Sequence, residues 1–496
     1  MYRSLSSSSF RALMVAMVLC ATIVVADRGG AHAGSQLSTL GLFPSADHVT
    51  LERFRRQPVY LELGMFVASP DETFELLVTR PDYAQPIQIQ RVIHHDALPD
   101  ELVDLPADIL ASWSGLADFI DVEVKNSAGE VVDSSTMAFC PNSYSRERIG
   151  DDGPQAPSYP DSCYSNPFTK GMVWGIDADW AVAALGFDSP PVYLKVGDYT
   201  ATVTIADRYV DLFGIDPSRA SATIDVTVEK VHFDCPKCGE RRRSATGQRP
   251  SSVPVVDTPD PAHLPDLIGL PAWGIGIDQR RRRTYLTFGA TVWNGGASSL
   301  VVEGFRRSHE DVMDAHQYFY ENGQPTGKAQ VGTMEFDTRS GHKHWHFLQF
   351  ARYSLLDQTQ TELIRSKKEA FCLAPTDAID LTVPNAVLVP YSIGLGSACG
   401  SATSLWTREI LPLGWGDTYS QSRPGQSFNI TDVPNGTYYI EVMGNPTGSL
   451  FEQTADNNSE LRRIILKGKS DNRRVVVPPW NGIDTETGYG GGKGGF

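Results

Sequence analysis

The sequence predicts a mainly β protein, with an N-terminal β-sandwich-like domain followed by a second β-rich domain. Glycine and proline are abundant, at 44 and 32 of 496 residues, and favour the many turns that short strands need. Several segments alternate apolar and polar residues and are rich in β-branched types, which is typical of strands with one buried face. Helical periodicity is weak along the chain, so we expect few helices.

Residues 1–33 have the composition of a secretory signal peptide. Arg3 and Arg11 supply a positive start, an apolar run follows at 12–26, and Ala-His-Ala at 31–33 fits a cleavage site. A cut directly after the apolar run is the alternative. The run is short for a membrane span. We therefore expect an exported protein, secreted or at the cell surface, with no stable span after cleavage; an uncleaved anchor is the other interpretation.

Residues 34–231 make up the predicted β-sandwich-like domain. We expect strands at 59–67, 119–135, 198–207 and 222–231, the second of these as two strands around an Asn-Ser-Ala-Gly turn. The sequence of this domain contains no cluster of metal ligands and no evident catalytic triad. Its role is open between attachment to a substrate, wall or matrix and a passive spacer.

Residues 232–262 form a predicted linker, because a segment rich in Ser, Pro and Asp resists packing. It carries a basic run at 240–244, and a second basic run at 280–283 precedes an expected strand. The whole chain has a net charge of −16, so we interpret both runs as solvated turns rather than as sites for anionic partners. For the same reason we expect no nucleic-acid partner.

Six cysteines follow the signal segment, and an even number in an exported chain predicts disulfide bonds. Sequence proximity favours the pairs Cys140–Cys163, Cys235–Cys238 and Cys372–Cys399. The Cys-Pro-Lys-Cys stretch is also half of a zinc site, but a site of cysteines alone would need two more thiolates nearby. A redox motif of the thioredoxin type would need a βαβ context, which the sequence does not suggest.

Residues 263–470 make up the second predicted domain, and a flexible Gly-rich tail is expected at 471–496. Within the domain we expect one strand through the histidines at 342–346 and others at 284–294, 298–305, 437–445 and 461–468.

Three of the eleven histidines alternate in one short stretch, at His342, His344 and His346. On a strand they share one face, with neighbours about 6.6 Å and the outer pair about 13 Å apart. Convergence of all three on one ion needs a bend, which Gly341 would allow. Imidazole suits copper, zinc, iron and nickel. A zinc hydrolase, a barrel-type oxygenase that uses two of the histidines, and a solvated strand without metal are all compatible with the pattern alone.

Several separate motifs between residues 264 and 470 resemble, in order and approximate spacing, the catalytic domain of the lysyl oxidase family. In chain order they are LPDL, LTFGATVWNGGASSL, SGHKHWHFLQFARYSLLD, SKKEAFCL, GWGDTY, GQSFNITDVPNGTYYIEV, GNP and ADNNS. Residues 34–262 are not covered by the resemblance. The loop at 374–414 diverges and carries no evident motif, so the sequence leaves the choice of substrate open.

The resemblance implies a copper-dependent amine oxidase whose quinone cofactor, lysyl tyrosylquinone, is made from its own side chains. The family's copper ligands fall on His342, His344 and His346. The cofactor residues fall on Lys368 and Tyr419, with Lys367 as the alternative lysine if the register differs by one. Copper and oxygen oxidise the phenol, and the lysine amine adds to the ring when it is neutral, which requires a desolvated pocket or a nearby positive charge.

Asp417 is the candidate base that removes a proton from the bound amine. It stands two residues before Tyr419, so in an extended segment the two side chains share a face. The alternative is a structural carboxylate that bonds the backbone of a Gly-rich turn.

The resemblance also implies a calcium site at the two ends of the domain. Its ligands fall on Asp266, the Leu267 carbonyl, Glu452, Asn457 and Asn458, and hard oxygen ligands of this kind suit calcium. Thr454 stands where the family commonly has an acid, and Asp456 is placed to compensate. An Asn-rich turn without an ion is the alternative.

The expected function is a secreted copper amine oxidase that converts primary amines, including peptidyl lysine, to aldehydes with ammonia and hydrogen peroxide as products and oxygen as co-substrate. The acidic balance suits cationic amines. One alternative is an exported copper- or zinc-binding or adhesion protein without a quinone, and another is a zinc hydrolase. Lys368 and Tyr419 separate these hypotheses, because neither alternative requires both residues.

Overall fold

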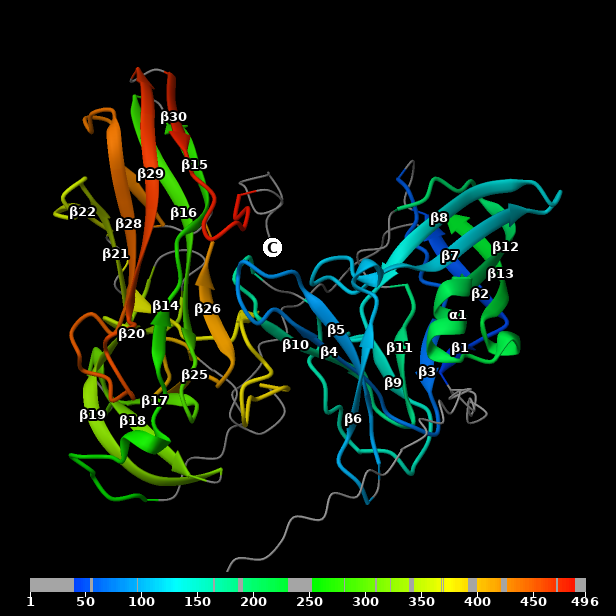
Figure 1. Cartoon of the computed structure of the whole chain (residues 1–496), viewed down its shortest axis with the longest axis horizontal. Coiled ribbons are helices and arrows are strands. Elements are labelled where there is room, and N and C mark those ends of the chain that lie inside the picture. The colour runs from blue at the N-terminus through cyan, green and yellow to red at the C-terminus, as the bar shows by residue number, and fades with distance from the viewer. Residues whose placement is uncertain are drawn as a thin grey trace, which may run out of the picture. The chain divides into compact units, whose positions relative to one another are not determined.

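The computed structural model describes residues 40–486 apart from short gaps (Figure 1). The gaps are 54–56, 96, 164–165, 186–190, 231–251, 281, 308–309, 322, 339–342, 367, 369, 391–398, 421–425 and 470–471. The predicted signal peptide and the Cys235–Cys238 pair lie outside the described residues. All of the described residues belong to one unit of contacting chain, Ser38–Phe496. Regular structure is almost entirely β, which confirms the predicted fold class.

The N-terminal region contains three sheets. The first has the order β1 (Gly41–Pro44), β3 (Met65–Ser69), β11 (Trp180–Ala183), β9 (Arg146–Arg148). The second has the order β10 (Gly171–Ile176), β4 (Phe74–Thr79), β5 (Gln88–Ile93), β6 (Glu101–Leu105). The third has the order β2 (His48–Arg53), β13 (Ser221–Lys230), β12 (Gly197–Ile205), β7 (Leu116–Asn126), β8 (Val131–Phe139).

The strands of the third sheet follow the alternation in the sequence. In β12, Ala201, Val203 and Ile205 are buried while the residues between them are partly exposed. The predicted hairpin is also present, and its turn closes where the Asn126 side chain accepts from backbone N–H groups and Gly129 adopts a φ of 78°. The strand expected at 59–67 differs, because regular pairing of β3 begins at Met65.

One short α-helix, α1 (Asp207–Phe213), interrupts the N-terminal strands. It ends at Gly214, whose φ of 66° places it in the left-handed region that favours glycine. Single 3₁₀ turns are η1 (Ala107–Ile109), η2 (Pro217–Arg219) and η3 (Pro261–His263). Among the described residues, no helix has the length and apolar character needed to cross a membrane.

The C-terminal region contains three further sheets. One has the order β14 (Leu267–Gly269), β16 (Arg283–Asn294), β26 (Trp415–Tyr419), β24 (Asp377–Ala378), with β15 (Trp273–Arg280) and β27 (Ser427–Asn429) also paired to β16. The next has the order β23 (Ala370–Phe371), β20 (Trp345–Leu348), β19 (Gln324–Phe336), β18 (Val312–Glu321), β17 (Leu300–Phe305), β25 (Trp406–Leu411). The last has the order β22 (Glu362–Arg365), β21 (Ala351–Leu356), β28 (Gly436–Gly444), β29 (Ser459–Lys469), β30 (Asn472–Val476).

Two expectations near the borders of this region need correction. Part of the predicted linker is docked, since Val256 N–H donates to the Lys328 carbonyl and Lys328 N–H donates to that of Pro254. The predicted tail begins with a strand, because β30 pairs with β29 and so continues the last sheet. The basic run at 280–283 lies where β15 returns into β16, and its described arginines are exposed as expected.

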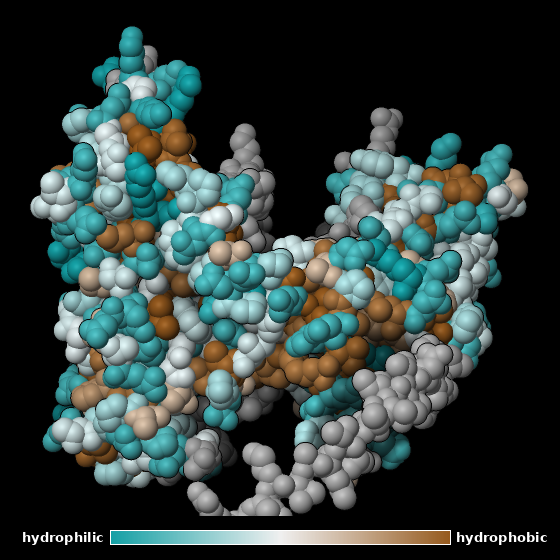
Figure 2. Space-filling view, in the orientation of Figure 1, coloured by the Kyte–Doolittle hydropathy of each residue, from teal (hydrophilic) through white to brown (hydrophobic). Residues whose placement is uncertain are grey.

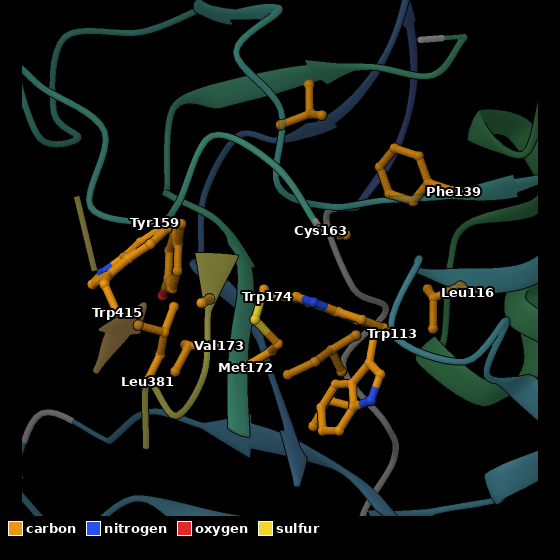
Figure 3. Close-up of a cluster of buried hydrophobic side chains, with 14 of the residues drawn as sticks. Trp113, Leu116, Phe139, Tyr159, Cys163, Met172, Val173, Trp174, Leu381 and Trp415 are labelled. Carbon is orange, nitrogen blue, oxygen red and sulfur yellow. The ribbon is translucent and has the colours of Figure 1, made fainter. Parts of the chain in front are cut away.

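Two of the predicted disulfide bonds are present, Cys140–Cys163 and Cys372–Cys399, and are thereby confirmed. The apolar side chains of the N-terminal and C-terminal regions join in one buried cluster. In Figure 3, Tyr159 and Val173 of the first region lie in the same cluster as Leu381 and Trp415 of the second. The face drawn in Figure 2 is largely hydrophilic with smaller apolar patches, as expected for an acidic chain.

Candidate active site

Two of the three predicted copper ligands lie together, His346 on strand β20 and His344 just before it. This strand pairs with β19 on one side, where His346 faces Glu335, and with β23 on the other, where Phe347 faces Phe371. His346 is buried, and its ring centroid lies 4.5 Å from that of His344. His344 precedes β20, which begins at Trp345, so the strand expected through the histidines starts later than predicted, yet the two imidazoles lie close together. His342 lies outside the described residues.

A carboxylate that the sequence did not single out lies beside these histidines. Asp337 Oδ2 is 3.8 Å from His346 Nδ1, and Asp337 N–H donates to the His344 carbonyl at 3.0 Å. A carboxylate in this position orients an imidazole and raises its basicity as a ligand. Within the described ranges, which omit His342, no three His, Cys, Asp or Glu side chains form a metal-holding group.

Lys368 reaches the predicted phenol from the segment that precedes β23. Its side chain is buried, and Nζ lies 4.1 Å from the ring centroid of Tyr419 and 4.8 Å from that of Phe371. Nζ also donates to the Ala370 carbonyl at 3.2 Å, and the backbone N–H of Lys368 donates to Ser366 Oγ at 3.1 Å. These contacts hold the amine over the phenol ring. Lys367 lies outside the described residues.

Tyr419 ends β26, and its hydroxyl donates to the Cys372 carbonyl at 3.1 Å. Cys372 is bonded to Cys399, whose carbonyl accepts from Trp345 N–H at 2.8 Å. The disulfide thus connects the segment under the phenol to the strand of the histidines. Burial raises the pKa of Tyr419 well above its usual value, and the carboxyl of Asp417 adds to the effect, so the hydroxyl keeps its proton.

Asp417 lies within β26, opposite Val292 of β16, and is 2% exposed. The strand geometry turns Asp417 and Tyr419 to one face and Thr418 to the other. Its Oδ2 atom is buried without a hydrogen-bond partner. Burial raises the pKa of Asp417 well above its usual value, whereas the charge of Lys368 lowers it. A carboxyl with one unpartnered oxygen and a raised pKa has the properties of a general base.

Three further titratable groups that the sequence did not single out lie around this site. Glu409 on β25 is fully buried, and its Oε2 accepts from Leu373 N–H at 3.0 Å while Oε1 has no partner. Burial raises the pKa of both Glu409 and Tyr353, and Asp417 raises both further. Asp377 on β24 raises the pKa of Asp417 in turn. Tyr353 lies within the quoted motif SGHKHWHFLQFARYSLLD, and Glu409 is the one acid of its strand, WTREIL, but neither pattern assigns these residues to the site.

The residues of the predicted calcium site also lie together. Asp266 Oδ2 accepts from Asn457 Nδ2 at 2.7 Å, and Glu452 Oε1 accepts from Asn458 Nδ2 at 2.8 Å. The Leu267 N–H donates to Glu452 Oε2 at 3.2 Å. The site therefore joins the start of the region to the loop between β28 and β29.

Two features of this cluster favour a bound cation. The side-chain oxygens of Asn457 and Asn458 are buried without hydrogen-bond partners. Burial raises the pKa of Glu452, the amide donors of Asn458 and Asn445 lower it, and the carboxyl of Asp266 raises it. Two carboxylates and two unpartnered amide oxygens are the donor set that a hard divalent cation satisfies. Asp456, which was expected to compensate for Thr454, is exposed.

The arrangement brings together an amine from the segment before β23 and a phenol and a carboxyl from β26, in the same region as the imidazoles of His344 and His346. An amine held against a phenol ring is the geometry from which a covalent link between them can form after oxidation of the ring. The neighbouring carboxyl is placed to take up a proton in the same pocket. The site thus places an amine and a carboxyl next to one phenol.

Comparison with known proteins gives the same family as the motifs. The sequence profile of the family described as lysyl oxidase matches residues 302–475. Lysyl oxidase homolog 4 of Mus musculus is 27% identical over 173 residues, 35% of this chain and 20% of its own length. Lysyl oxidase homolog 2 of Gallus gallus is 25% identical over 166 residues, 33% of this chain and 19% of its own length. The chain thus spans about a fifth of the length of these curated relatives.

Proposed function

We propose that the lysyl oxidase-family catalytic domain in this chain oxidises primary amines to aldehydes, with Lys368 and Tyr419 as the precursors of a lysyl tyrosylquinone cofactor. The contact of Lys368 Nζ with the Tyr419 ring, at 4.1 Å from its centroid, carries the proposal. These residues are far apart in the sequence, and an amine buried over a phenol serves no evident purpose in a protein that only binds metal. The family match to residues 302–475 supports the same conclusion.

Copper would be held by His344 and His346, together with His342. The two described imidazoles lie close together, and Asp337 beside His346 is the kind of partner that orients a metal-bound histidine. Imidazole is a suitable ligand for copper. The donors present therefore fit the metal that the family implies.

The cofactor, once formed, supplies an electrophilic carbonyl and accepts two electrons from the substrate amine. The residues of this chain supply placement and proton transfer. Asp417 takes the proton from the carbon next to the amine nitrogen, because its Oδ2 is free of other hydrogen bonds. Phe371, whose ring packs edge-on against Tyr419 with centroids 5.0 Å apart, fixes the ring in position.

Primary amines, including lysine side chains of other proteins, are the proposed substrates, and oxygen is the co-substrate. The net charge of −16 favours the approach of cationic amines. The signal-like segment at 1–33 and the paired cysteines support action outside the cell.

A calcium ion is proposed at Asp266, Leu267, Glu452, Asn457 and Asn458. The buried oxygens of both asparagines lack partners, and a cation there would satisfy them and offset the two carboxylates. Such an ion would stabilise the domain by joining β14 to the loop that follows β28. It takes no part in the proposed chemistry.

Mass spectrometry tests the cofactor directly. The full chain is expressed with export, loaded with copper in air and digested, and a cross-linked peptide pair containing residues 368 and 419 is expected. Lys368→Met should remove this pair, whereas the same change at the neighbouring Lys367 should leave it. A protein that binds copper fully and stays unlinked would instead be an exported metal-binding or adhesion protein. Hydrolysis without oxygen consumption would identify a zinc hydrolase.

A further inference from the structure

A segment of the N-terminal region, residues 166–171, hydrogen-bonds to the chain just after β24. The N–H groups of Lys170 and Gly171 both approach the Ile379 carbonyl, at 2.6 and 3.3 Å, and Leu381 N–H donates to the Gly171 carbonyl at 2.9 Å. We call residues 166–171 the brace segment. Gly171 forms an isolated parallel bridge with Asp380, just beyond the end of β24, although the brace segment lies about 200 positions earlier in the sequence.

Two side chains of the brace segment extend these contacts toward β26. Thr169 is fully buried, and its Oγ1 donates to the Ala378 carbonyl at 2.8 Å. Asn166 Nδ2 makes a long contact of 3.4 Å with Thr291 Oγ1, which lies 2.7 Å from Thr418 Oγ1. Thr418 stands between the candidate base and the phenol, and its side chain faces away from both.

The brace segment contacts β24, which pairs with β26, the strand that carries Asp417 and Tyr419. Asp377 pairs with Gly416 and Ala378 pairs with Trp415, so β24 and β26 are antiparallel neighbours in the sheet. The Thr418 N–H donates to Thr376 Oγ1 at 2.7 Å. β26, which carries Asp417 and Tyr419, is thus hydrogen-bonded to β24 on one side and to β16 on the other.

Side chains pack closely around the contact between the brace segment and residues 379–382. Phe168 is fully buried with Leu270, Trp273 and Ile379 in a cluster of their own. A Cβ atom at Gly171 would lie 2.3 Å from Asp380 Oδ1 and 2.5 Å from Thr382 Oγ1, so a larger residue there would have to displace these two side chains. Trp415, two residues before Asp417, belongs to the core cluster drawn in Figure 3 with Val173 of β10.

We propose that the brace segment is a positioning element of the active site, so that the N-terminal region is a required part of the catalytic unit and not a spacer. Thr169 and Gly171 are hydrogen-bonded to β24 and to the residues just after it, and β24 is hydrogen-bonded to β26. The position of β26 in turn sets where the base and the phenol lie relative to the Lys368 amine. A displacement of reacting groups by about 1 Å can cost on the order of 100-fold in rate. The catalytic part of this inference rests on the proposed amine oxidase function, whereas the mechanical part does not.

Hydrogen exchange of the full chain tests the mechanical part without any need for activity. Thr169→Val removes the hydroxyl that bonds Ala378, and Thr169→Ser keeps it. We expect faster exchange in peptides that cover 377–382 and 415–419 for the valine variant and near-normal exchange for the serine variant. Thr202→Val is the matched control, because Thr202 Oγ1 bonds Thr223 on β13, within a different sheet. It should leave both peptides unchanged.

Steady-state kinetics with a primary alkyl amine tests the catalytic part. For Thr169→Val and Gly171→Ala we expect kcat to fall by about 10-fold or more at a similar KM and copper content, with a shifted pH profile of kcat. Thr169→Ser should restore both parameters, and Thr202→Val should match the unmodified protein.

Three results would contradict, in turn, the brace segment as a positioning element, its role in catalysis and the proposed function. Normal exchange at 377–382 and 415–419 in both Thr169→Val and Gly171→Ala would overturn the brace. Faster exchange with unchanged kcat and pH profile would overturn its role in catalysis. If the unmodified protein forms no cross-link and no peroxide, the proposed function fails, and hydrogen exchange still decides whether the brace exists.

Discussion

Two clusters in the C-terminal region both bury carboxyl groups whose pKa is raised, but they neutralise them differently. At Asp417 the opposing charge comes from the chain itself, because Lys368 lowers the pKa that burial raises. At Glu452 the groups that lower the pKa are neutral amides, and its charged neighbour is a second carboxyl, Asp266. The first cluster contains its own cation, and the second has the composition of a site for an external one.

The difference separates chemistry from stability. For a carboxyl beside a protein amine, the amine offsets part of the rise in pKa that burial causes. Such a carboxyl can exchange a proton during a reaction. A pair of carboxylates among amide oxygens is costly to bury unless a cation joins them, and that cation then becomes part of the folded structure. We therefore expect changes in the first cluster to affect turnover and changes in the second to affect unfolding.

Loss of the phenol should give the largest effect. Tyr419→Phe keeps the ring that packs against Phe371 but removes the oxygen that becomes part of the cofactor. We expect no detectable peroxide with alkyl amines, no cross-linked peptide and nearly unchanged copper content. Tyr353→Phe is the matched control, because Tyr353 is a buried phenol of the same pocket that lies outside the proposed cross-link. Loss of copper together with activity in Tyr419→Phe would contradict the assigned roles.

Removal of the candidate base should give the next largest effect. Asp417→Asn keeps the shape of the side chain but cannot take up the proton, so kcat should fall by about 10²- to 10⁴-fold. The cross-linked peptide should still form, which separates the base from the cofactor residues. Asp377→Asn alters the neighbouring carboxyl on β24 and should reduce kcat much less. If both variants lose activity equally, Asp417 is not the base.

Calcium should affect stability rather than turnover. Calcium at about 100 times its Kd should stabilise the folded chain by about 2.7 kcal/mol, which differential scanning calorimetry detects as a raised Tm. Glu452→Gln should remove most of this rise, because it deletes a carboxylate that accepts from Leu267 and Asn458. Asp456→Asn, an exposed change in the same loop, should keep the rise. A Tm that ignores calcium in the unmodified chain would exclude the site.

The smallest expected effect is a pH dependence of the calcium-free protein. Burial raises the folded-state pKa of Glu452 above its unfolded value. Its contribution to stability is therefore fully present below the unfolded pKa and is lost as pH rises through the folded pKa. Urea unfolding across this range should show a decline that Glu452→Gln reduces. An identical decline in that variant would assign the effect to other groups.

Local sequence determined much of the strand content, and its motifs predicted the candidate site residues. Alternation and β-branched residues specified β12, β13, β16 and β28, because a strand side chain either faces the core or does not. The turn after Asn126 and the disulfides Cys140–Cys163 and Cys372–Cys399 also follow from neighbours in the chain. The motifs around Lys368 and Tyr419 predict this pair, and the two side chains are in contact in the structure.

Tertiary structure alone decided which distant groups meet. The sequence patterns around Glu409 and Tyr353 do not place either residue at the site, and each became part of it because its strand packs there. The contact of Thr169 with Ala378 is invisible in the sequence for the same reason. Helix α1 is too short for its periodicity to be recognised, and β30 forms because the exposed edge of β29 accepts it. Short-range patterns fix what a segment prefers, whereas long-range packing selects its neighbours, and here those neighbours create the site.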